Sequence, residues 1–137
     1  ECLKLRSQDR CMVMPTVLVI DDDVSLYDLI ENTLSMIQVR CEFFNHAEAG
    51  IAFAKQHQPH LILMDLLLPK GIKGWEAIGL LKADAQTKHI PVIAFTAGTG
   101  HYIKQAMESG ASEFIVKPFS INQFQKTVMQ YIGATQQ

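Results

Sequence analysis

The feature that most constrains the fold of this chain is a regular alternation of short apolar runs with amphipathic segments. Five runs predict β-strands because they are rich in apolar, β-branched or aromatic side chains: residues 16–20, 40–44, 61–64, 92–95 and 113–116. Segments with apolar residues at helical spacing follow them, at 24–37, 46–56, 75–83, 101–109 and from 120 onwards. The spacing is too short for anything but βα units. It predicts an α/β domain with a parallel sheet, right-handed crossovers and helices on both faces.

The composition indicates one ordinary soluble domain. The 137 residues are 48% hydrophobic and 19% charged, and the net charge of −2 does not favour binding to nucleic acid or an anionic membrane. No apolar run approaches the ~18 residues of a membrane span. We expect no signal peptide and a cytoplasmic location. Cys2, Cys11 and Cys41 lack metal-ligand spacing and are expected to be free thiols in a reducing compartment.

The expected domain occupies residues 16–133. Residues 1–15 show no clear periodicity and are expected to be an extension or linker. Ser120 is expected to cap the last helix and Gly133 to end it, which leaves residues 134–137 as a tail.

Polar side chains suited to phosphate or metal chemistry follow four of the five predicted strands. They are Asp21, Asp22 and Asp23 after the first strand, Asp65 after the third, Thr96 after the fourth and Lys117 after the fifth. The second strand contributes none. In parallel α/β sheets, ligands bind at the carboxyl ends of the strands where the strand order reverses. We therefore expect these residues to share one edge of the sheet.

Asp65 interrupts the apolar run "LILMDLLLP" and, considered alone, is as consistent with a turn residue as with a functional one. Grouped carboxylates need a cation, because each like-charge pair at ~4 Å costs about 4 kcal/mol at an effective dielectric near 20. Mg²⁺ prefers carboxylate oxygens and water as ligands, so we expect Asp21, Asp22 and Asp65 to bind this ion. A carboxylate nucleophile, a metal, the Thr96 hydroxyl and the Lys117 ammonium together predict a phosphoryl-transfer site.

The segments "VLVIDDD", "LILMDLLLP", "FTAG" and "SGASEFIVKPF", in this order, resemble the receiver domain of bacterial two-component response regulators from about Thr16 to Ile132. The resemblance implies a flavodoxin-like, doubly wound (βα)5 fold with strand order 2-1-3-4-5. It also implies that Asp65 accepts a phosphoryl group from a histidine kinase or phosphotransfer protein, and that the domain then acts on a downstream protein. Such a domain is a signalling phosphoacceptor that catalyses only its own phosphorylation and dephosphorylation.

The resemblance also assigns individual roles. Asp22, more than Asp21, would ligate Mg²⁺ directly, and the backbone carbonyl of Leu67 would be a further ligand. Thr96 and Lys117 would bind the phosphoryl oxygens, and Thr96 and Phe114 would form the switch. A cis peptide would join Lys117 to Pro118. Separately from the resemblance, a homodimer through the face between the fourth and fifth helices stays open, and no feature of the sequence demands it.

Three departures from the family pattern stand out. The loop "KGIKG" after Pro69 is one residue longer than usual. Leu67 occupies a position where polar residues often occur, and we expect its side chain to hinder attacking water and lengthen the phosphorylated state. No output domain follows in this chain.

Several alternatives stay open. The chain could be a receiver from a hybrid kinase or a phosphorelay shuttle, or a receiver-like module that no longer accepts phosphate, although no site residue is missing. A haloacid-dehalogenase-type phosphatase would need an acid at Leu67, two residues after its nucleophile. A flavodoxin-like cofactor binder would need a Ser/Thr/Gly-rich loop after the first strand, where this chain has acids.

Overall fold

The computed structural model of the protein describes residues 14–97 and 100–136, in which a five-stranded parallel sheet has the order β2-β1-β3-β4-β5. The strands are β1 (Thr16–Ile20), β2 (Arg40–Phe44), β3 (Leu61–Met64), β4 (Val92–Thr96) and β5 (Glu113–Val116). The α-helices are α1 (Tyr27–Ser35), α2 (Ala47–His57), α3 (Gly74–Ala83), α4 (Gly100–Ser109) and α5 (Ile121–Gln136). The predicted flavodoxin-like fold and strand order are confirmed. The predicted extension over residues 1–15, with Cys2 and Cys11, lies almost entirely outside the described residues.

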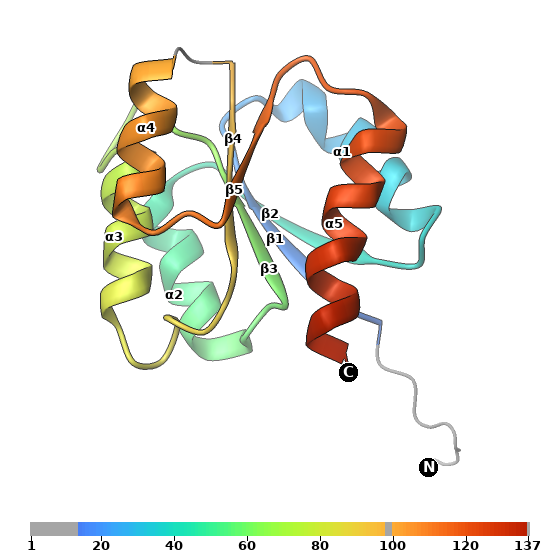
Figure 1. Ribbon diagram of the computed structural model, residues 1–137, viewed down its shortest axis with the longest axis horizontal. Helices are drawn as coiled ribbons and strands as arrows, with labels where there is room; N and C mark the ends of the chain where they lie inside the picture. Colours follow the sequence, from blue (N-terminus) through green and yellow to red (C-terminus); the bar gives the residue numbers. More distant parts are fainter. Residues whose placement is uncertain (1–13, 98–99, 137) are drawn as a thin grey trace.

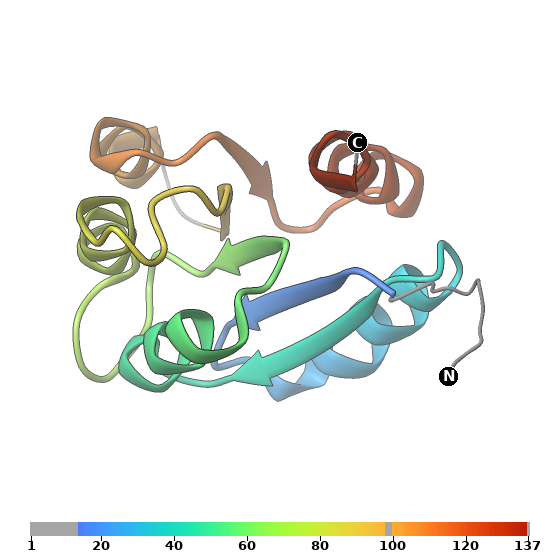
Figure 2. The ribbon, with the colours of Figure 1, turned by 90° about the horizontal axis from the view of Figure 1, so that it is seen from below.

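Alternate residues of the central strands pack into two separate cores. Leu18 and Ile20 of β1 face the core that α2, α3 and α4 cover, whereas Val17 and Val19 face the core that α1 and α5 cover. Figures 1 and 2 show these two helical layers on opposite sides of the sheet. The carboxyl ends of the strands point toward the top of Figure 1. None of the helices in the described part of the chain is long and apolar enough to cross a membrane.

The first predicted helix is divided. Asp23 accepts a hydrogen bond from the Ser25 N–H at 3.1 Å and begins a 3-10 turn, η1 (Val24–Leu26), before α1 starts at Tyr27. The turn is tight because the Leu26 N–H donates to the Asp23 carbonyl three residues earlier, at 3.1 Å, while the Asp23 side chain caps the Ser25 N–H.

The prediction that Gly133 ends the last helix is wrong, because α5 continues to Gln136. Glycine costs only about 1 kcal/mol in a helix interior. Burial of Phe124, Val128 and Ile132 against the sheet is the stronger effect. The predicted capping by Ser120 is confirmed, since its hydroxyl accepts a hydrogen bond from the Gln123 N–H at 3.3 Å.

Backbone packing fixes the loop after Asp65. Gly74 begins α3 so close to the segment that follows β3 that a Cβ there would lie 2.6 Å from the Leu66 Cα. The loop itself is held by Glu48 of α2, whose carboxylate accepts a hydrogen bond from the Ile72 N–H at 3.3 Å. Gly71 adopts a φ of 74°, which favours glycine. The loop is therefore held by one left-handed residue and a contact with the Glu48 side chain.

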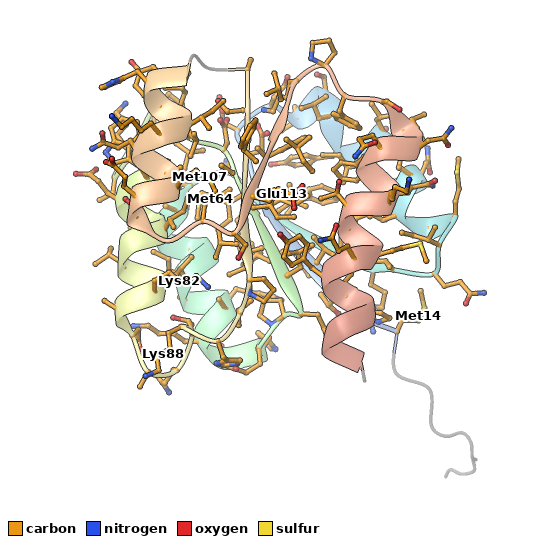
Figure 3. The ribbon with its side chains drawn as sticks, in the orientation of Figure 1. Met14, Met64, Lys82, Lys88, Met107 and Glu113 are labelled. Carbon is orange, nitrogen blue, oxygen red and sulfur yellow. The ribbon has the colours of Figure 1, made fainter. Side chains whose placement is uncertain are left out.

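The connection into β4 is tied to the end of α3 by Lys82. Its Nζ donates hydrogen bonds to the carbonyls of Lys88 at 3.2 Å and Ile90 at 2.6 Å. Figure 3 shows Lys82 and Lys88 together near the lower end of α3. Burial lowers the pKa of the Lys82 ammonium. These two hydrogen bonds hold the segment that leads into β4, the strand whose other end carries Thr96.

Candidate functional site

A pocket of about 520 Å³ opens at the carboxyl edge of the sheet. Its lining brings together six of the seven predicted site residues with three neighbours: Asp21, Asp22, Asp65, Leu67, Thr96 and Lys117, and Asp23, Val24 and Ala97. None of the described residues of β2 is part of this lining. The expected convergence of four strand ends on one edge is thus present in the fold.

The remaining predicted residue, Phe114, lies outside the pocket lining. It stands on β5 opposite Ala94, and 44% of its surface is exposed. The burial of β5 alternates, with Phe114 and Val116 exposed and Glu113 and Ile115 half-buried. The aromatic ring therefore belongs to the outer face of the edge strand in this conformation.

Three carboxylates in the pocket are close enough to share one cation. Asp21, Asp22 and Asp65 each present an oxygen, and these oxygens lie within 4.8 Å of one another. Asp21 is completely buried, Asp65 is 6% exposed and Asp22 is exposed. An all-oxygen donor set with one open side fits a hard divalent ion such as Mg²⁺, which keeps several of its waters.

Lys117 supplies the positive charge within this group. Its Nζ lies 2.6 Å from Asp21 Oδ2 and 3.8 Å from Asp65 Oδ2. The same Nζ lies 4.8 Å from the centroid of the Phe95 ring, a cation–π contact. Phe95 packs in turn against Phe119 and Phe124. The ammonium therefore lies between carboxylates and the Phe95 ring, and no local sequence pattern indicates that Phe95 contacts the site.

Thr96 ends β4 beside this cation. It is completely buried and lines the pocket, and its carbonyl accepts a hydrogen bond from the Lys117 N–H at 2.9 Å. The peptide that follows, between Lys117 and Pro118, is cis as expected. The backbone hydrogen bond between Lys117 and Thr96 joins the ends of β4 and β5, and Thr96 and Lys117 both line the pocket together with Asp65.

The electrostatic setting of Asp65 is unusual for a carboxyl group. Burial raises its pKa from 3.8 to about 6. The Leu67 N–H, which donates to Oδ1 at 3.1 Å, and the Lys117 charge lower the pKa, while the negative charge of Asp21 raises it. Without a bound cation, ionised Asp65 is therefore disfavoured by its surroundings, and a divalent ion would offset that cost.

This pKa predicts a pH-dependent stability in the absence of divalent cations. The Asp65 carboxyl holds its proton more tightly in the folded domain than in the unfolded chain. Its contribution to the free energy of unfolding is therefore complete below pH 3.8 and is lost as the pH rises through about 6. We expect the free energy of unfolding to fall by on the order of 1 kcal/mol from pH 5 to pH 7 on this account. Urea denaturation of wild type and Asp65→Asn at both pH values isolates the contribution. If the free energy of unfolding changed equally with pH in the two proteins, the predicted contribution of Asp65 would be contradicted.

A comparison with known families identifies the class of protein. A family model for the response regulator receiver domain matches residues 17–129. The chain therefore belongs to the receiver domain family of two-component response regulators.

Individual relatives agree with this assignment. The DNA-binding dual master transcriptional regulator RpaA of Synechocystis sp. is 35% identical over 123 residues, which cover 89% of this chain and 51% of RpaA. The polar-differentiation response regulator DivK of Brucella anthropi is 36% identical over 124 residues, which cover 86% of this chain and 96% of DivK. The chain thus spans about half the length of RpaA and nearly all of DivK.

The fold is shared with solved receiver domains. The receiver domain of the sensor histidine kinase PA1611 from Pseudomonas aeruginosa superimposes with a TM-score of 0.79 at 24% identity. The match covers 88% of this chain and 99% of that domain, whose structure has a magnesium ion coordinated in its active site cleft.

Proposed function

We propose that this domain accepts a phosphoryl group on Asp65 from a histidine kinase or a phosphotransfer protein in the cytoplasm, and that its altered surface then acts on a downstream protein. The observation that carries the proposal is the meeting of Asp65 with Lys117, Thr96 and two further carboxylates in one pocket. Membership of the receiver family supports the same conclusion.

The reaction uses the carboxylate of Asp65 as the nucleophile. One of its oxygens attacks the phosphorus of a phosphohistidine, an O–P bond forms, and the P–N bond breaks. The electron pair of the P–N bond stays on the imidazole nitrogen, which takes up a proton from water. Lys117 and Thr96 would bind the oxygens of the transferred group, because an ammonium and a hydroxyl both donate hydrogen bonds to an oxyanion. A carboxylate that is already ionised needs no general base.

Asp21, Asp22 and Asp65, with the carbonyl of Leu67, would hold Mg²⁺. When bound, this ion would neutralise negative charge on the phosphoryl group and the surrounding carboxylates. Lys117 alone cannot balance three carboxylates and an incoming phosphoryl group.

The proposed switch joins Thr96 to Phe114. Thr96 would move toward the new phosphoryl oxygens, and the Phe114 ring, now exposed, would turn into the space beside it. Exposed apolar side chains also occur on β5 and on the helices on either side of it, α4 and α5 (Figure 1): Val116, Met107, Ile121 and Met129. This face would therefore change when Asp65 is modified, and it is where a downstream protein or a second copy of the domain would bind.

The proposed function is tested by incubating the protein with Mg²⁺ and acetyl phosphate, followed by intact-mass analysis. We expect a mass gain of one phosphoryl group that depends on Mg²⁺ and is blocked by beryllofluoride, which mimics the modified carboxylate. No gain under these conditions would overturn the proposal.

Leu67 is expected to set the lifetime of the phosphorylated state. Its side chain lines the pocket and is 41% exposed. Leu67→Asn replaces an apolar barrier with an amide that can hydrogen-bond an attacking water. A transition-state hydrogen bond of about 1 kcal/mol predicts roughly fivefold faster dephosphorylation. The decay is followed by mass or by inorganic phosphate release, with the equally exposed Leu29→Asn as control. Unchanged decay in Leu67→Asn would refute the role.

A further inference from the structure

Tyr27, the first residue of α1, reaches back to the end of β1. Its hydroxyl donates a hydrogen bond to the backbone carbonyl of Asp21 at 2.8 Å. That carbonyl belongs to the peptide that joins Asp21 to Asp22, two of the acids that line the pocket. The contact is therefore made to the backbone from which the exposed Asp22 carboxylate projects.

The other polar groups of Asp21 are also held. Its N–H donates to the carbonyl of Phe44 at 2.9 Å. Its carboxylate accepts the Asp23 N–H at 2.9 Å and contacts Lys117 Nζ at 2.6 Å. Tyr27 supplies the contact to the carbonyl. Without it, the Asp21–Asp22 peptide could rotate more freely beyond the last paired residue of β1.

The position of the Tyr27 hydroxyl is determined by β2. The Tyr27 ring stacks on Phe43, with 4.2 Å between the centroids and 21° between the planes. Phe43 pairs with Val19 in the sheet, so the ring has a rigid support. Strand β2, which places no residue in the pocket lining, thus supports the acidic edge of the pocket, Asp21 and Asp22, through Phe43 and Phe44.

We propose that Tyr27 is a positioning residue for the cation site: its hydroxyl fixes the Asp21–Asp22 peptide and so preorganises the Asp22 carboxylate for a divalent ion. The proposal rests on the proposed Mg²⁺ site, because a positioned carboxylate matters only if an ion binds there.

Tyr27→Phe removes the hydroxyl and keeps the ring that stacks on Phe43. Tyr131→Phe is a matched control, because its hydroxyl donates to Glu113 Oε1 at 2.8 Å, at the opposite end of β5 from Lys117. Figure 3 marks Glu113 on β5. Each substitution deletes one tyrosine hydroxyl that donates a hydrogen bond within the protein, but only Tyr27→Phe removes a hydrogen bond to Asp21.

The experiment is a titration of ¹⁵N-labelled protein with MgCl₂, followed by NMR, for wild type and both variants. We expect Mg²⁺ to bind Tyr27→Phe about three- to tenfold more weakly than wild type, the range that corresponds to one net hydrogen bond. Tyr131→Phe should match wild type. At saturating Mg²⁺, phosphorylation of Tyr27→Phe by acetyl phosphate should proceed at the wild-type rate, which a general loss of structure would not allow.

The possible failures are distinguishable. Equal Mg²⁺ affinities for wild type and Tyr27→Phe would overturn the role of Tyr27 and leave the proposed function intact. An equal loss of Mg²⁺ affinity in both tyrosine variants would also overturn the role of Tyr27, since the loss would then come from reduced stability and not from a misplaced Asp22 carboxylate. Absence of Mg²⁺ binding by wild type would overturn both the role of Tyr27 and the metal site of the proposed function.

Discussion

Asp65→Asn is expected to abolish the phosphoryl adduct completely. The amide keeps the shape of the side chain and removes the nucleophilic oxygen, so acetyl phosphate and Mg²⁺ should produce no mass gain. The variant should also unfold less readily than wild type at pH 7 without divalent ions. Burial disfavours the ionised carboxylate that the substitution removes, since it raises the Asp65 pKa to about 6.

Asp28→Asn serves as the control for this experiment. Asp28 is an exposed acid in the first turn of α1 and is not part of the pocket lining. Its substitution should leave the adduct unchanged. An adduct that persists in Asp65→Asn would show that another acid is the nucleophile, and Asp21 and Asp22 are the nearest candidates.

Lys117→Met is expected to slow phosphorylation by roughly 100- to 1000-fold at saturating Mg²⁺, the usual effect of removing one preorganised donor to a developing oxyanion. Mg²⁺ itself should bind at least as tightly as to wild type, because the ammonium that lies 2.6 Å from Asp21 Oδ2 competes with the ion for that carboxylate. Rates come from intact-mass time courses, and affinity comes from the MgCl₂ titration.

Lys55→Met is the matched control, since Lys55 pairs with Asp84 at 3.1 Å and does not line the pocket. It removes a lysine from an ion pair without touching the site, so both rate and affinity should stay at wild-type values. Parallel losses of rate and Mg²⁺ affinity in Lys117→Met would show that the lysine maintains the pocket structure rather than binding the phosphoryl group.

The acidic edge also explains why the β2 strand matters although none of its side chains lines the pocket. Phe44 accepts the Asp21 N–H, and Phe43 supports the tyrosine that holds the Asp21 carbonyl. We therefore expect the proposed phosphoryl transfer to depend on packing behind the carboxylates as well as on the carboxylates themselves.

Much of the fold could be predicted from local patterns. Strand and helix periodicity are properties of neighbouring residues, so "TVLVI" and "LILM" were enough to predict buried parallel strands, now β1 and β3. Local pattern was less reliable at segment ends. Gly133 was expected to end α5, but packing of that helix on the sheet outweighs the small cost of a glycine.

The identity of the chemical groups at the strand ends can be predicted from local sequence, because Asp21, Asp65, Thr96 and Lys117 each follow a recognisable strand directly. The interactions among these groups follow only from the fold. Lys117 reaches Asp21 across 96 positions of sequence, the Phe95 ring lies beside its ammonium, and the Tyr27 hydroxyl finds the Asp21 carbonyl. Such contacts and the burial that raises the Asp65 pKa depend on how whole elements pack, and no local pattern records that packing.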